Sequence, residues 1–550
     1  MAEALADDLR CHRSGLPVLA RPDTVAYSVG RFVRRHRALS LGAAGVLLSL
    51  ALGLAGTLLQ ARRAHHERDL ALAASRRALA TQQFVFDLLG DAARAGQPLS
   101  TAELMRRAEQ VARRTLADRP DELAGVLSMV ALDETTQHDA ARTRTLIDEA
   151  ADLARDPALR AHLQCQAQAL AGLSRQPDVD LQRLRDRVAD PALDGSARTA
   201  CQLALSQLLI QNGNLAEAGQ QVQAAWSELS ERPEAWRDRL RALSMQTFLR
   251  ADGRAAGLDA LIEPTLRELE RQGRSRNDGV LGLYNTWGTM AMASGEPAKA
   301  VARYGRVVEV LQAEHPQGRL PGYHLDLLAR AQAAQGDLSA AAALLDRSLA
   351  LSSGDSPERF RALCLRAHID ALRNQHAQAD RGFAQAAAIT DRGEPMRRNA
   401  NPVCIAARAE AHVLAGRPGD ALALLQTLAV PSLPGPSRLA AQLVQAEAEL
   451  GLGQKPAAAL TAQAAEQLAR QLQADNRWSW RVGQALMLRA LAAPEGPTSP
   501  AAQALIAEAR QHLEATVLPT QRWRRVAETT APTGLVPAAA AAASRTAAGP

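Results

Sequence analysis

Thiols and imidazoles are the side chains through which this chain could hold a metal ion or form a covalent cross-link. Five cysteines are spread over 550 residues with no C-x-x-C pair and no histidine at zinc-finger spacing: Cys11, Cys165, Cys201, Cys364 and Cys404. Cys165 and Cys201 are 36 residues apart, and Cys364 and Cys404 are 40 apart, so each pair could lie on adjacent helices. A disulfide needs Cα atoms within about 7 Å, whereas packed helix axes lie about 8 to 10 Å apart. We therefore expect free, buried cysteines and no metal site.

His65, His66 and Glu67 place three metal-ligating side chains in a row. Adjacent histidines on a helix point about 100° apart, because a helix has about 3.6 residues per turn, and they do not easily share one ion. We interpret these residues as part of a solvated stalk, and we expect no metal and no cofactor.

Motifs for enzymatic catalysis are missing from the sequence. It contains no G-x-S-x-G, H-E-x-x-H or G-x-x-x-x-G-K-[ST] segment. A protein kinase would need a Gly-rich loop, a strand lysine, a His-Arg-Asp loop and Asp-Phe-Gly, and His36-Arg37-Ala38 lacks the aspartate. The lysines Lys299 and Lys455 both fall in turns that open helices, which leaves none for an ATP-phosphate site. The chain is therefore not expected to be an enzyme.

The elements that position the polar side chains are predicted to be helices. Hydrophobic residues make up 47% of the chain and aromatic residues 3%, so a core must be built largely from Ala and Leu, which suits helices better than strands. The 64 basic and 58 acidic residues give a net charge of +6 and are interspersed. A nucleic-acid surface would show a clustered basic face, so no nucleic-acid partner is expected. The predicted fold class is all-α.

From about residue 121 the chain repeats itself. Residues 295–304, preceded by Tyr284, Trp287 and Gly288, resemble a tetratricopeptide repeat, in which a small residue lets two helices cross and an aromatic residue, here Tyr304, fills the gap. Further hairpins are expected at 121–154, 157–190 and 476–516, and turn residues recur at 213, 253, 295, 336, 374, 416 and 453. Each hairpin buries its apolar face only by stacking on its neighbours, which predicts an α-solenoid with a concave groove. The alternative is an irregular helical array without that groove.

In the tetratricopeptide family the first helix of each hairpin lines the groove. The resemblance implies eight lining residues: Asn285, Tyr323, Asp326, Arg330, Arg361, His368, Glu410 and Glu447. Their mixed charge suits a protein or peptide ligand in the groove, and the alternative for each is an ordinary exposed helix position. The Lys and Asn set of the chaperone-binding carboxylate clamp is not matched, so that partner is not expected.

Residues 38–61 form a stretch of 24 residues without a charge, between Arg37 and Arg62. As a helix it would be about 36 Å long at about 1.5 Å per residue, enough to cross a hydrocarbon core of about 30 Å. We interpret it as a single-pass transmembrane helix. A cleaved signal peptide would begin nearer residue 1, and a buried helix of a soluble regulator would carry a polar stripe. Five arginines flank each side, so charge does not decide the orientation.

One face of this helix carries small residues at every fourth position: Gly45, Ser49, Gly53 and Thr57. Such a face lets two helix backbones approach closely in lipid and would support a homodimer. The alternative is that the ladder follows from a composition rich in Ala and Gly.

The residues around the span carry a second resemblance. Asp7-Asp8-Leu9-Arg10, the segments 15–24 and 30–37, and Leu99-Ser100-Thr101-Ala102-Glu103-Leu104 resemble the regions flanking the membrane helix in membrane-anchored bacterial serine/threonine kinases with tetratricopeptide repeats. In that family the kinase domain is cytoplasmic and the repeats lie beyond the membrane. The resemblance implies a bacterial inner membrane protein with a periplasmic array. The spacing of Ser100 and Glu103 also predicts a helix from Thr101.

These patterns predict a membrane-anchored, non-catalytic interaction scaffold or signal-input module. The alternative is the sensor half of a membrane serine/threonine kinase whose catalytic domain is lost, split or encoded upstream. The expected organisation is a basic tail (1–37), a transmembrane helix (38–61), a helical stalk (62–95), a repeat array (96–520) and a disordered Ala/Pro-rich tail (521–550).

Overall fold

The computed structural model describes most of the chain from Thr101 onward. The described residues are 101–136, 140–171, 177–193, 195–251, 257–314, 320–352, 354, 356–390, 401–474 and 476–530, with residues 6, 9, 10, 13, 33, 42, 46, 48–50, 52–54, 56, 57 and 60. Every regular element among them is a helix, so the predicted all-α class is confirmed. The chain divides into two compact units, Met1–Arg155 and Asp156–Pro550. The expected stalk, 62–95, lies outside the described residues.

The first unit contains three packed helices, α4 (Thr101–Thr115), α5 (Pro120–Thr136) and α6 (Ala140–Leu153), with α5 against both neighbours. Helix α4 begins at Thr101, as the capping-box spacing predicts. Leu127 and Ile147 are fully buried between the helices. Helices α5 and α6 form the hairpin expected at 121–154.

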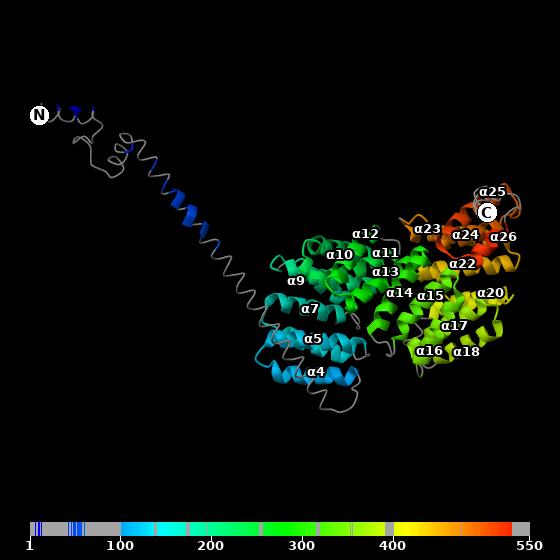
Figure 1. The fold of residues 1–550 in the computed structure, drawn as a ribbon, viewed down its shortest axis with the longest axis horizontal. Helices are drawn as coiled ribbons and strands as arrows, with labels where there is room; N and C mark the ends of the chain where they lie inside the picture. The colour runs from blue at the N-terminus through cyan, green and yellow to red at the C-terminus, as the bar shows by residue number, and fades with distance from the viewer. Residues whose placement is uncertain are drawn as a thin grey trace, which may run out of the picture. The chain divides into compact units, whose positions relative to one another are not determined.

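The second unit is a run of antiparallel helices, drawn from cyan to red in Figure 1. Its helices are α7 (Pro157–Ala171), α8 (Pro177–Val188), α9 (Gly195–Gln211), α10 (Leu215–Leu229), α11 (Trp236–Ala251), α12 (Asp259–Arg271), α13 (Asp278–Ser294), α14 (Pro297–Glu314), α15 (Gly322–Gln335), α16 (Leu338–Leu351), α17 (Pro357–Leu372), α18 (His376–Thr390), α20 (Asn401–Leu414), α21 (Pro418–Leu425), α22 (Gly435–Gly451), α23 (Lys455–Gln473), α24 (Trp480–Leu491), α25 (Pro500–Thr516) and α26 (Arg522–Thr529). Short 3-10 turns lie at Pro233–Ala235 and Val430–Ser432.

The hairpins stack through their first helices, which is the arrangement that a solenoid requires. Helix α7 packs on α9, α11 on α13, α15 on α17, α17 on α20, and α20 on α22. The second helix of each hairpin, such as α14, α16 or α18, packs back on its own first helix. The predicted array of tetratricopeptide-like hairpins is therefore confirmed as an architecture.

The predicted turns fall between paired helices. Gly213, Gly295, Gly336, Gly416 and Gly453 all have positive φ angles, and Asn374 takes the same left-handed conformation with φ 61°. Glycine adopts this conformation without the steric cost that a Cβ atom would bring. The weaker copy at residue 253 lies outside the described residues.

Gly288 and Tyr304 fit together as the repeat pattern predicts. A Cβ atom built on Gly288 would lie 2.5 Å from a Tyr304 ring carbon, so only glycine lets α13 and α14 cross at this distance. The Tyr304 ring fills the space and is itself 2% exposed. The hydroxyl groups of Tyr304 and Thr289 are hydrogen-bonded at 2.9 Å.

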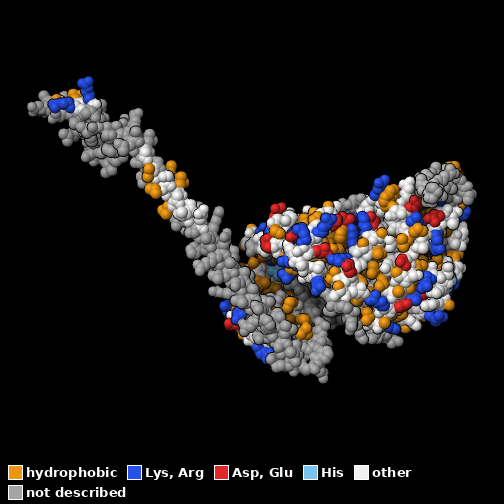
Figure 2. All heavy atoms as spheres, viewed as in Figure 1, with side chains coloured by type: hydrophobic (Ala, Val, Ile, Leu, Met, Phe, Trp, Pro, Cys, Tyr) orange, Lys and Arg blue, Asp and Glu red, His pale blue; other side chains and the backbone are white. Residues whose placement is uncertain are grey.

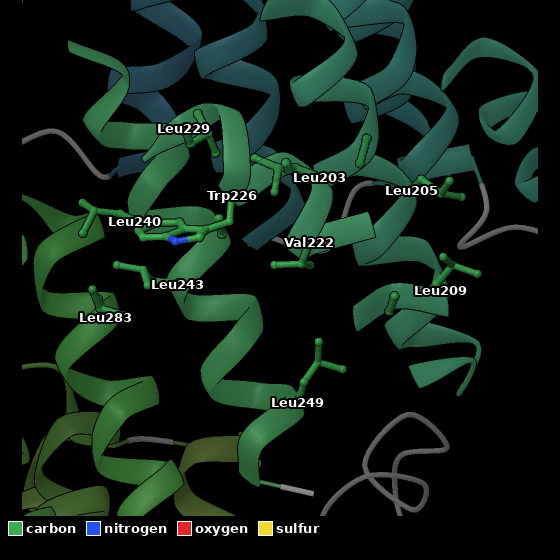
Figure 3. Close-up of a cluster of buried hydrophobic side chains, with 14 of the residues drawn as sticks. Leu203, Leu205, Leu209, Val222, Trp226, Leu229, Leu240, Leu243, Leu249 and Leu283 are labelled. Atoms are coloured by element: carbon green, nitrogen blue, oxygen red, sulfur yellow. The ribbon is translucent and has the colours of Figure 1, made fainter. Parts of the chain in front are cut away.

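The core of the second unit is rich in Leu and Ala, as the composition requires. Figure 3 shows one cluster in which Leu203, Leu205, Val222, Trp226 and Leu243 come from α9, α10 and α11. Shortening one such leucine to alanine costs about 2 to 5 kcal/mol in stability.

The C-terminal helices fold back onto the middle of the array. The backbone N–H of Trp480 donates to the carbonyl of Gly295 (3.0 Å), and that of Leu518 donates to the carbonyl of Gln335 (2.9 Å). The Thr520 hydroxyl donates to the carbonyl of Gly336 (2.9 Å). The turns that end α13 and α15 are thus held by segments from the far end of the sequence.

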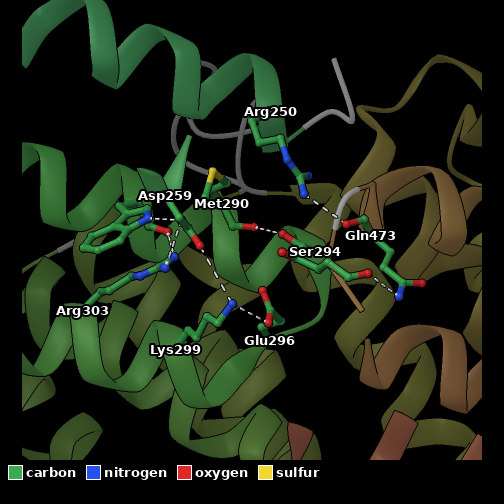
Figure 4. Close-up of polar contacts among 10 residues, drawn as sticks. Arg250, Asp259, Met290, Ser294, Glu296, Lys299, Arg303 and Gln473 are labelled. Carbon is green, nitrogen blue, oxygen red and sulfur yellow. Dashed lines mark hydrogen bonds and ion pairs between the residues drawn. The ribbon is translucent and has the colours of Figure 1, made fainter. Parts of the chain in front are cut away.

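Arg250 makes a similar link from α11. This buried arginine donates to the carbonyls of Leu472 (3.2 Å) and Gln473 (3.0 Å) at the end of α23. Figure 4 shows the contact between Arg250 and Gln473. The array from α11 to α23 therefore curves far enough for α11 to contact the end of α23.

The tail prediction is wrong at its start. Helix α26 falls within 521–550, where disorder was expected, yet Trp523 and Ala527 are buried against the last hairpins. A single tryptophan supplies a large apolar surface, so a short helix is ordered by packing and not by its own propensity. Residues 531–550 lie outside the described residues.

The cysteine prediction is also wrong. Cys165 is bonded to Cys201 and Cys364 to Cys404, with Cα atoms 5.1 and 5.6 Å apart. The prediction compared the Cα distance that a disulfide needs with the distance between helix axes. Cα atoms lie about 2.3 Å from the axis, so facing atoms on helices about 9 to 10 Å apart come within about 5 Å of each other. The disulfides link α7 to α9 and α17 to α20.

Most of the predicted span, 38–61, lies outside the described residues, and those of its residues that are described are helical. Within the described part of the chain, no helix combines the length and apolar character needed to cross a membrane.

Candidate functional site

The structure places all eight predicted lining residues on first helices of successive hairpins. Helix α13 carries Asn285; α15 carries Tyr323, Asp326 and Arg330; α17 carries Arg361 and His368; α20 carries Glu410; and α22 carries Glu447. Two further arginines reach the same region from the returning segment: Arg481 of α24 and Arg522 of α26. We call these ten residues the inner polar face.

The first part of this face joins α13, α15 and α17. The Asn285 amide donates to Nδ1 of His324 at 3.2 Å, while its own oxygen has no hydrogen-bond partner among the described residues. The His324 ring packs edge-on against Tyr323, with centroids 5.5 Å apart. The Arg361 guanidinium lies 5.9 Å from the centre of the Tyr323 ring. Tyr323 is the exposed aromatic side chain of the group.

Asp326 has a hydrogen-bond partner for one of its two carboxylate oxygens among the described residues. Its side chain is 7% exposed, and one oxygen accepts a hydrogen bond from the Ser348 hydroxyl at 2.7 Å. The other oxygen is buried without a partner in the described part of the chain. Burial raises the pKa of Asp326 to about 6, and the Ser348 hydrogen bond and the Arg361 charge offset only part of that rise.

The second part of the face is a charged chain from α17 to α26. Nε2 of His368 lies 3.0 Å from a Glu410 oxygen, and Arg522 lies 3.9 Å from the other Glu410 oxygen. Arg522 also forms an ion pair with Glu447. Burial alone would raise the pKa of Glu410, but His368, Arg522 and Arg481 together lower it to about 2. Burial raises the pKa of Glu447 in spite of Arg522, and its second oxygen has no partner among the described residues.

Sequence reasoning missed Arg481, Arg522 and His324. His324 follows a predicted lining residue directly, in the first turn of α15, and Pro321 is the N-cap of that helix. Arg481 and Arg522 lie in hairpins more than 100 residues after α15, and only the curvature of the whole array brings them back. No local signal in the sequence marks them.

A different polar cluster lies on α12, α13 and α14, and Figure 4 shows it. Asp259 accepts hydrogen bonds from the Trp287 indole (2.6 Å) and from Arg303 (3.2 Å). Lys299 lies 2.7 Å from Glu296 and 3.9 Å from Asp259. Arg303 also stacks 3.7 Å from the centre of the Trp287 ring and donates to the Trp287 carbonyl. We call these five residues the paired cluster, because each charge has an opposite charge or an acceptor.

Neither region offers a metal site. Across the part of the chain that the structure describes, no group of three or more His, Cys, Asp and Glu side chains is placed to hold a metal ion.

The small-residue face of residues 38–61 is only partly described, since Gly45 lies outside the described residues. The Ser49 hydroxyl donates to the Val46 carbonyl (2.9 Å), and the Thr57 hydroxyl donates to the carbonyls of Leu54 (2.9 Å) and Gly53 (3.1 Å). Both hydroxyls are thus satisfied within their own helix.

Among comparisons with known proteins, the one with solved structures finds similar chains. No protein-family model matches the chain, and none of the curated proteins matches it. A tetratricopeptide repeat protein from Parabacteroides merdae aligns with 50% of this chain and 97% of its own, at 16% identity and a TM-score of 0.34. The apo quorum sensor NprR from B. thuringiensis aligns with 65% of this chain and 99% of its own, at 10% identity and a TM-score of 0.41.

A third similar structure is the Cut9-Hcn1 hetero-tetramer of the APC/C. It aligns with 77% of this chain and 93% of its own, at 13% identity and a TM-score of 0.21.

Proposed function

We propose that this chain is a non-catalytic protein-interaction module whose inner polar face binds an extended segment of a protein partner. The observation that carries the proposal is the set of buried, unpartnered polar atoms on that face. One oxygen of each of Asn285, Asp326 and Glu447 lacks a partner among the described residues, although each side chain is at least nine-tenths buried. A buried polar group without a hydrogen bond costs about 1 to 3 kcal/mol.

A peptide is the ligand class that meets this arrangement best. The face carries both donors and acceptors, and a peptide backbone supplies both kinds of group at regular spacing. The exposed Tyr323 ring adds an amphipathic surface of the kind found at binding hot spots. A catalytic role has no comparable support, because no nucleophile on this face is paired with a general base.

Selection of peptide ligands tests the proposal directly. Full-length protein in detergent micelles is used to select binders from a random dodecapeptide phage library, and synthetic copies of the selected peptides are titrated by fluorescence anisotropy. Tyr323→Ala should weaken binding about tenfold, the usual effect of removing an aromatic hot spot. Arg347→Gln, on the exposed side of α16, is the control and should leave the affinity unchanged. Failure to select any peptide, or equal binding by Tyr323→Ala, would contradict the proposal.

We further propose that residues 38–61 anchor the module in a membrane. The described large side chains of this stretch, Val46, Leu48, Leu50, Leu52 and Leu54, are between 59% and 65% exposed. Exposed apolar side chains of this kind are favourable in lipid and costly in water. A dimer through the small-residue face is tested by Gly53→Leu. A Cβ atom at Gly53 meets nothing within 4 Å in the chain itself, so loss of span-mediated dimers would report a second copy.

The two disulfides favour an oxidising compartment for the repeat array. Disulfides between helices persist outside the reducing cytosol, so we place the array in the periplasm, as the kinase-family resemblance implies. A protease-protection assay in intact spheroplasts, with a tag after Pro550, decides the side of the membrane. Digestion of the array from outside supports this topology, and protection until lysis contradicts it.

The segments that flank residues 38–61 resemble those of membrane-anchored serine/threonine kinases, and this resemblance supports an alternative function. In that case the array is the sensor half of a membrane serine/threonine kinase whose catalytic domain is encoded upstream. The reading frame before Met1 distinguishes the two: a kinase catalytic domain that ends at this boundary would replace the stand-alone scaffold.

A further inference from the structure

The start of α24 is held by two successive backbone amides. The N–H of Trp480 donates to the carbonyl of Gly295 at 3.0 Å, in the turn that ends α13. The preceding N–H, that of Ser479, donates to Nδ1 of His512 in α25 at 3.0 Å. A Cβ atom built on Gly295 would lie 2.0 Å from Ser479 Oγ, so the two segments are in close contact. We call these four residues the closure contact, because they join the returning hairpin to the middle of the array.

His512 can take part in the closure contact only as a neutral ring. A backbone N–H is always a donor, so Nδ1 of His512 is the acceptor and the ring proton lies on Nε2. His512 is 4% exposed and Ser479 is 1% exposed, so little water reaches this hydrogen bond. Protonation would place an N–H on Nδ1 that faces the N–H of Ser479, and a buried donor without an acceptor is costly.

The charges that act on the ring come from α23 and from α25 itself. Burial lowers the pKa of His512, and the charge of Arg470 on α23 lowers it further. Glu508 and Glu466 raise it, but both carboxylates are already paired with Arg470, at 2.6 and 2.8 Å. Glu466 is also paired with Arg489 of α24. Helices α24 and α26 pack on α25 as well, and among the described residues neither brings a charge directly onto the ring.

An aromatic side chain also packs on the imidazole. Trp478 lies edge-on to His512, with ring centroids 5.3 Å apart. The guanidinium of Arg477 lies 4.8 Å from the centre of the Trp478 ring. An imidazolium here would share its surroundings with two arginines, Arg477 and Arg470, so these surroundings favour the neutral ring.

We propose that His512 makes the closure contact pH-dependent: the neutral ring holds the start of α24 against the turn that ends α13, and protonation of the ring releases it. This inference goes beyond the proposed function and does not depend on any peptide ligand. The closed form binds one proton fewer than the released form. Closure is therefore complete above the ordinary imidazole pKa of about 6.5 and weakens as the pH falls below it.

A second return contact provides an internal comparison. At the turn that ends α15, the backbone N–H of Leu518 donates to the carbonyl of Gln335, and the Thr520 hydroxyl donates to the carbonyl of Gly336. Amides and hydroxyl groups do not titrate between about pH 5 and 8. The release at α24 should therefore be local and should leave the contact at Leu518 in place.

Hydrogen exchange tests this inference, because the amides of Ser479 and Trp480 are themselves the donors of the closure contact. Exchange of full-length protein in detergent micelles is followed by mass spectrometry from about pH 7.5 to about pH 5, the range in which an imidazole titrates. The rates are corrected for the pH dependence of chemical exchange. We expect the protection of these two amides to fall by up to about tenfold per pH unit below about 6.5, the dependence that one proton gives. The amide of Leu518 should keep its protection.

Two histidine variants assign the response. His512→Asn keeps an acceptor, since the side-chain oxygen can replace Nδ1, and removes the titration. Protection of Ser479 and Trp480 should then be independent of pH. His412→Asn is the matched control: His412 is 8% exposed and burial also lowers its pKa, but it lies on α20, outside the closure contact. This variant should keep the full response.

Arg470→Gln tests the same ring without changing it. Removing this charge moves the pKa of His512 in the closed form towards its ordinary value, so the loss of protection in acid should become smaller. If Asn fails to replace the ring, protection in His512→Asn is low at every pH and Arg470→Gln decides. An unchanged response in Arg470→Gln then overturns the inference.

Three further results would overturn it. The first is constant protection of Ser479 and Trp480 down to about pH 5 in the unmodified protein. The second is a pH response that His512→Asn retains or that His412→Asn removes. The third is an equal loss of protection at Leu518, which would mean that acid loosens the whole array.

Discussion

The paired cluster and the inner polar face are both polar regions of the same helical array, and they are built differently. In the paired cluster, Asp259 accepts from Trp287 and Arg303, and Lys299 is shared between Glu296 and Asp259. On the inner polar face, buried oxygens of Asp326 and Glu447 lack partners among the described residues. A region that only holds helices together satisfies its polar atoms internally. A region whose buried polar atoms have no hydrogen-bond partner within the described part of the fold is the better candidate for binding another molecule.

The largest expected effect on stability comes from removing the disulfide between two helices that carry the inner polar face. Cys364 and Cys404 link α17 to α20, the helices that carry His368 and Glu410. Replacing both cysteines with serine should lower the unfolding free energy by about 4 kcal/mol, since the bond closes a loop of 40 residues. It should also weaken peptide binding, because the two helices lose their fixed spacing.

The other disulfide is a matched control. Cys165 and Cys201 close a loop of 36 residues between α7 and α9, which carry no residue of the inner polar face. Their double serine variant should lose a similar amount of stability in urea unfolding and keep its affinity for the selected peptides. Equal loss of binding in both variants would mean that losing either disulfide disturbs the whole array, and that the inner polar face is not a distinct site.

The paired cluster should be the more costly of the two polar regions to break by a single substitution. Asp259→Ala leaves Arg303, which is 8% exposed, without its carboxylate and Trp287 without its acceptor. Arg303 is buried but the Asp259 side chain is 41% exposed, so solvent screens part of the attraction and the cost should be about 2 to 3 kcal/mol, less than for a fully buried pair. Hydrogen exchange should show faster opening of α12 to α14, and a change below about 1 kcal/mol would place the cluster among ordinary surface ion pairs.

Some features of the two polar regions could be predicted from the sequence, and others could not. Gly288 with Tyr304 and the turn glycines were predictable, because each reflects contacts within one hairpin. The position of the eight predicted residues on first helices follows from the same local repeat. That they line a groove stays a prediction. Arg481 and Arg522 could not be predicted, because small rotations between successive hairpins accumulate before the chain returns to α15.

The cysteines show a different limit. Their spacing of about one repeat was visible in the sequence, but it could not establish that the facing Cα atoms of Cys165 and Cys201 come within 5.1 Å. That distance depends on the small residues at the contact between α7 and α9, which let the helices pack closely. Spacing alone therefore gave the correct neighbouring cysteines, but the prediction that they are free was wrong.

Two carboxyl groups of the inner polar face should have opposite effects on the pH dependence of stability. The pKa of Glu410 is lowered to about 2 in the folded chain, so its ionised form stabilises the fold above its ordinary pKa, and this contribution is lost as the pH falls from about 4.5 towards 2. The pKa of Asp326 is raised to about 6, so stability falls as the pH rises from about 4 through 6 and the buried carboxyl ionises.

Urea unfolding between pH 2.5 and pH 8 measures both effects. At pH 7, Glu410→Gln should destabilise the chain by about 2 kcal/mol, and Asp326→Asn should stabilise it by about 1 to 2 kcal/mol. A destabilised Asp326→Asn variant would show that the ionised carboxylate is satisfied within the fold, and would remove one of the open acceptors on which the binding proposal depends.

The smallest expected effect separates packing from recognition on α13, the helix that belongs to both regions. Gly288→Ala pushes a methyl group to 2.5 Å from the Tyr304 ring, and overpacking of this kind costs about 1 to 2 kcal/mol. Gly282→Ala, on the same helix, meets nothing within 4 Å and should stabilise by up to about 1 kcal/mol through helix propensity. Thermal unfolding should therefore shift in opposite directions for the two variants. Gly288→Ala should also weaken peptide binding, because displacing Tyr304 moves α14 against α13, the helix that carries Asn285. If the stability of this variant changes while its affinity for the peptides does not, Gly288 has a role in packing alone.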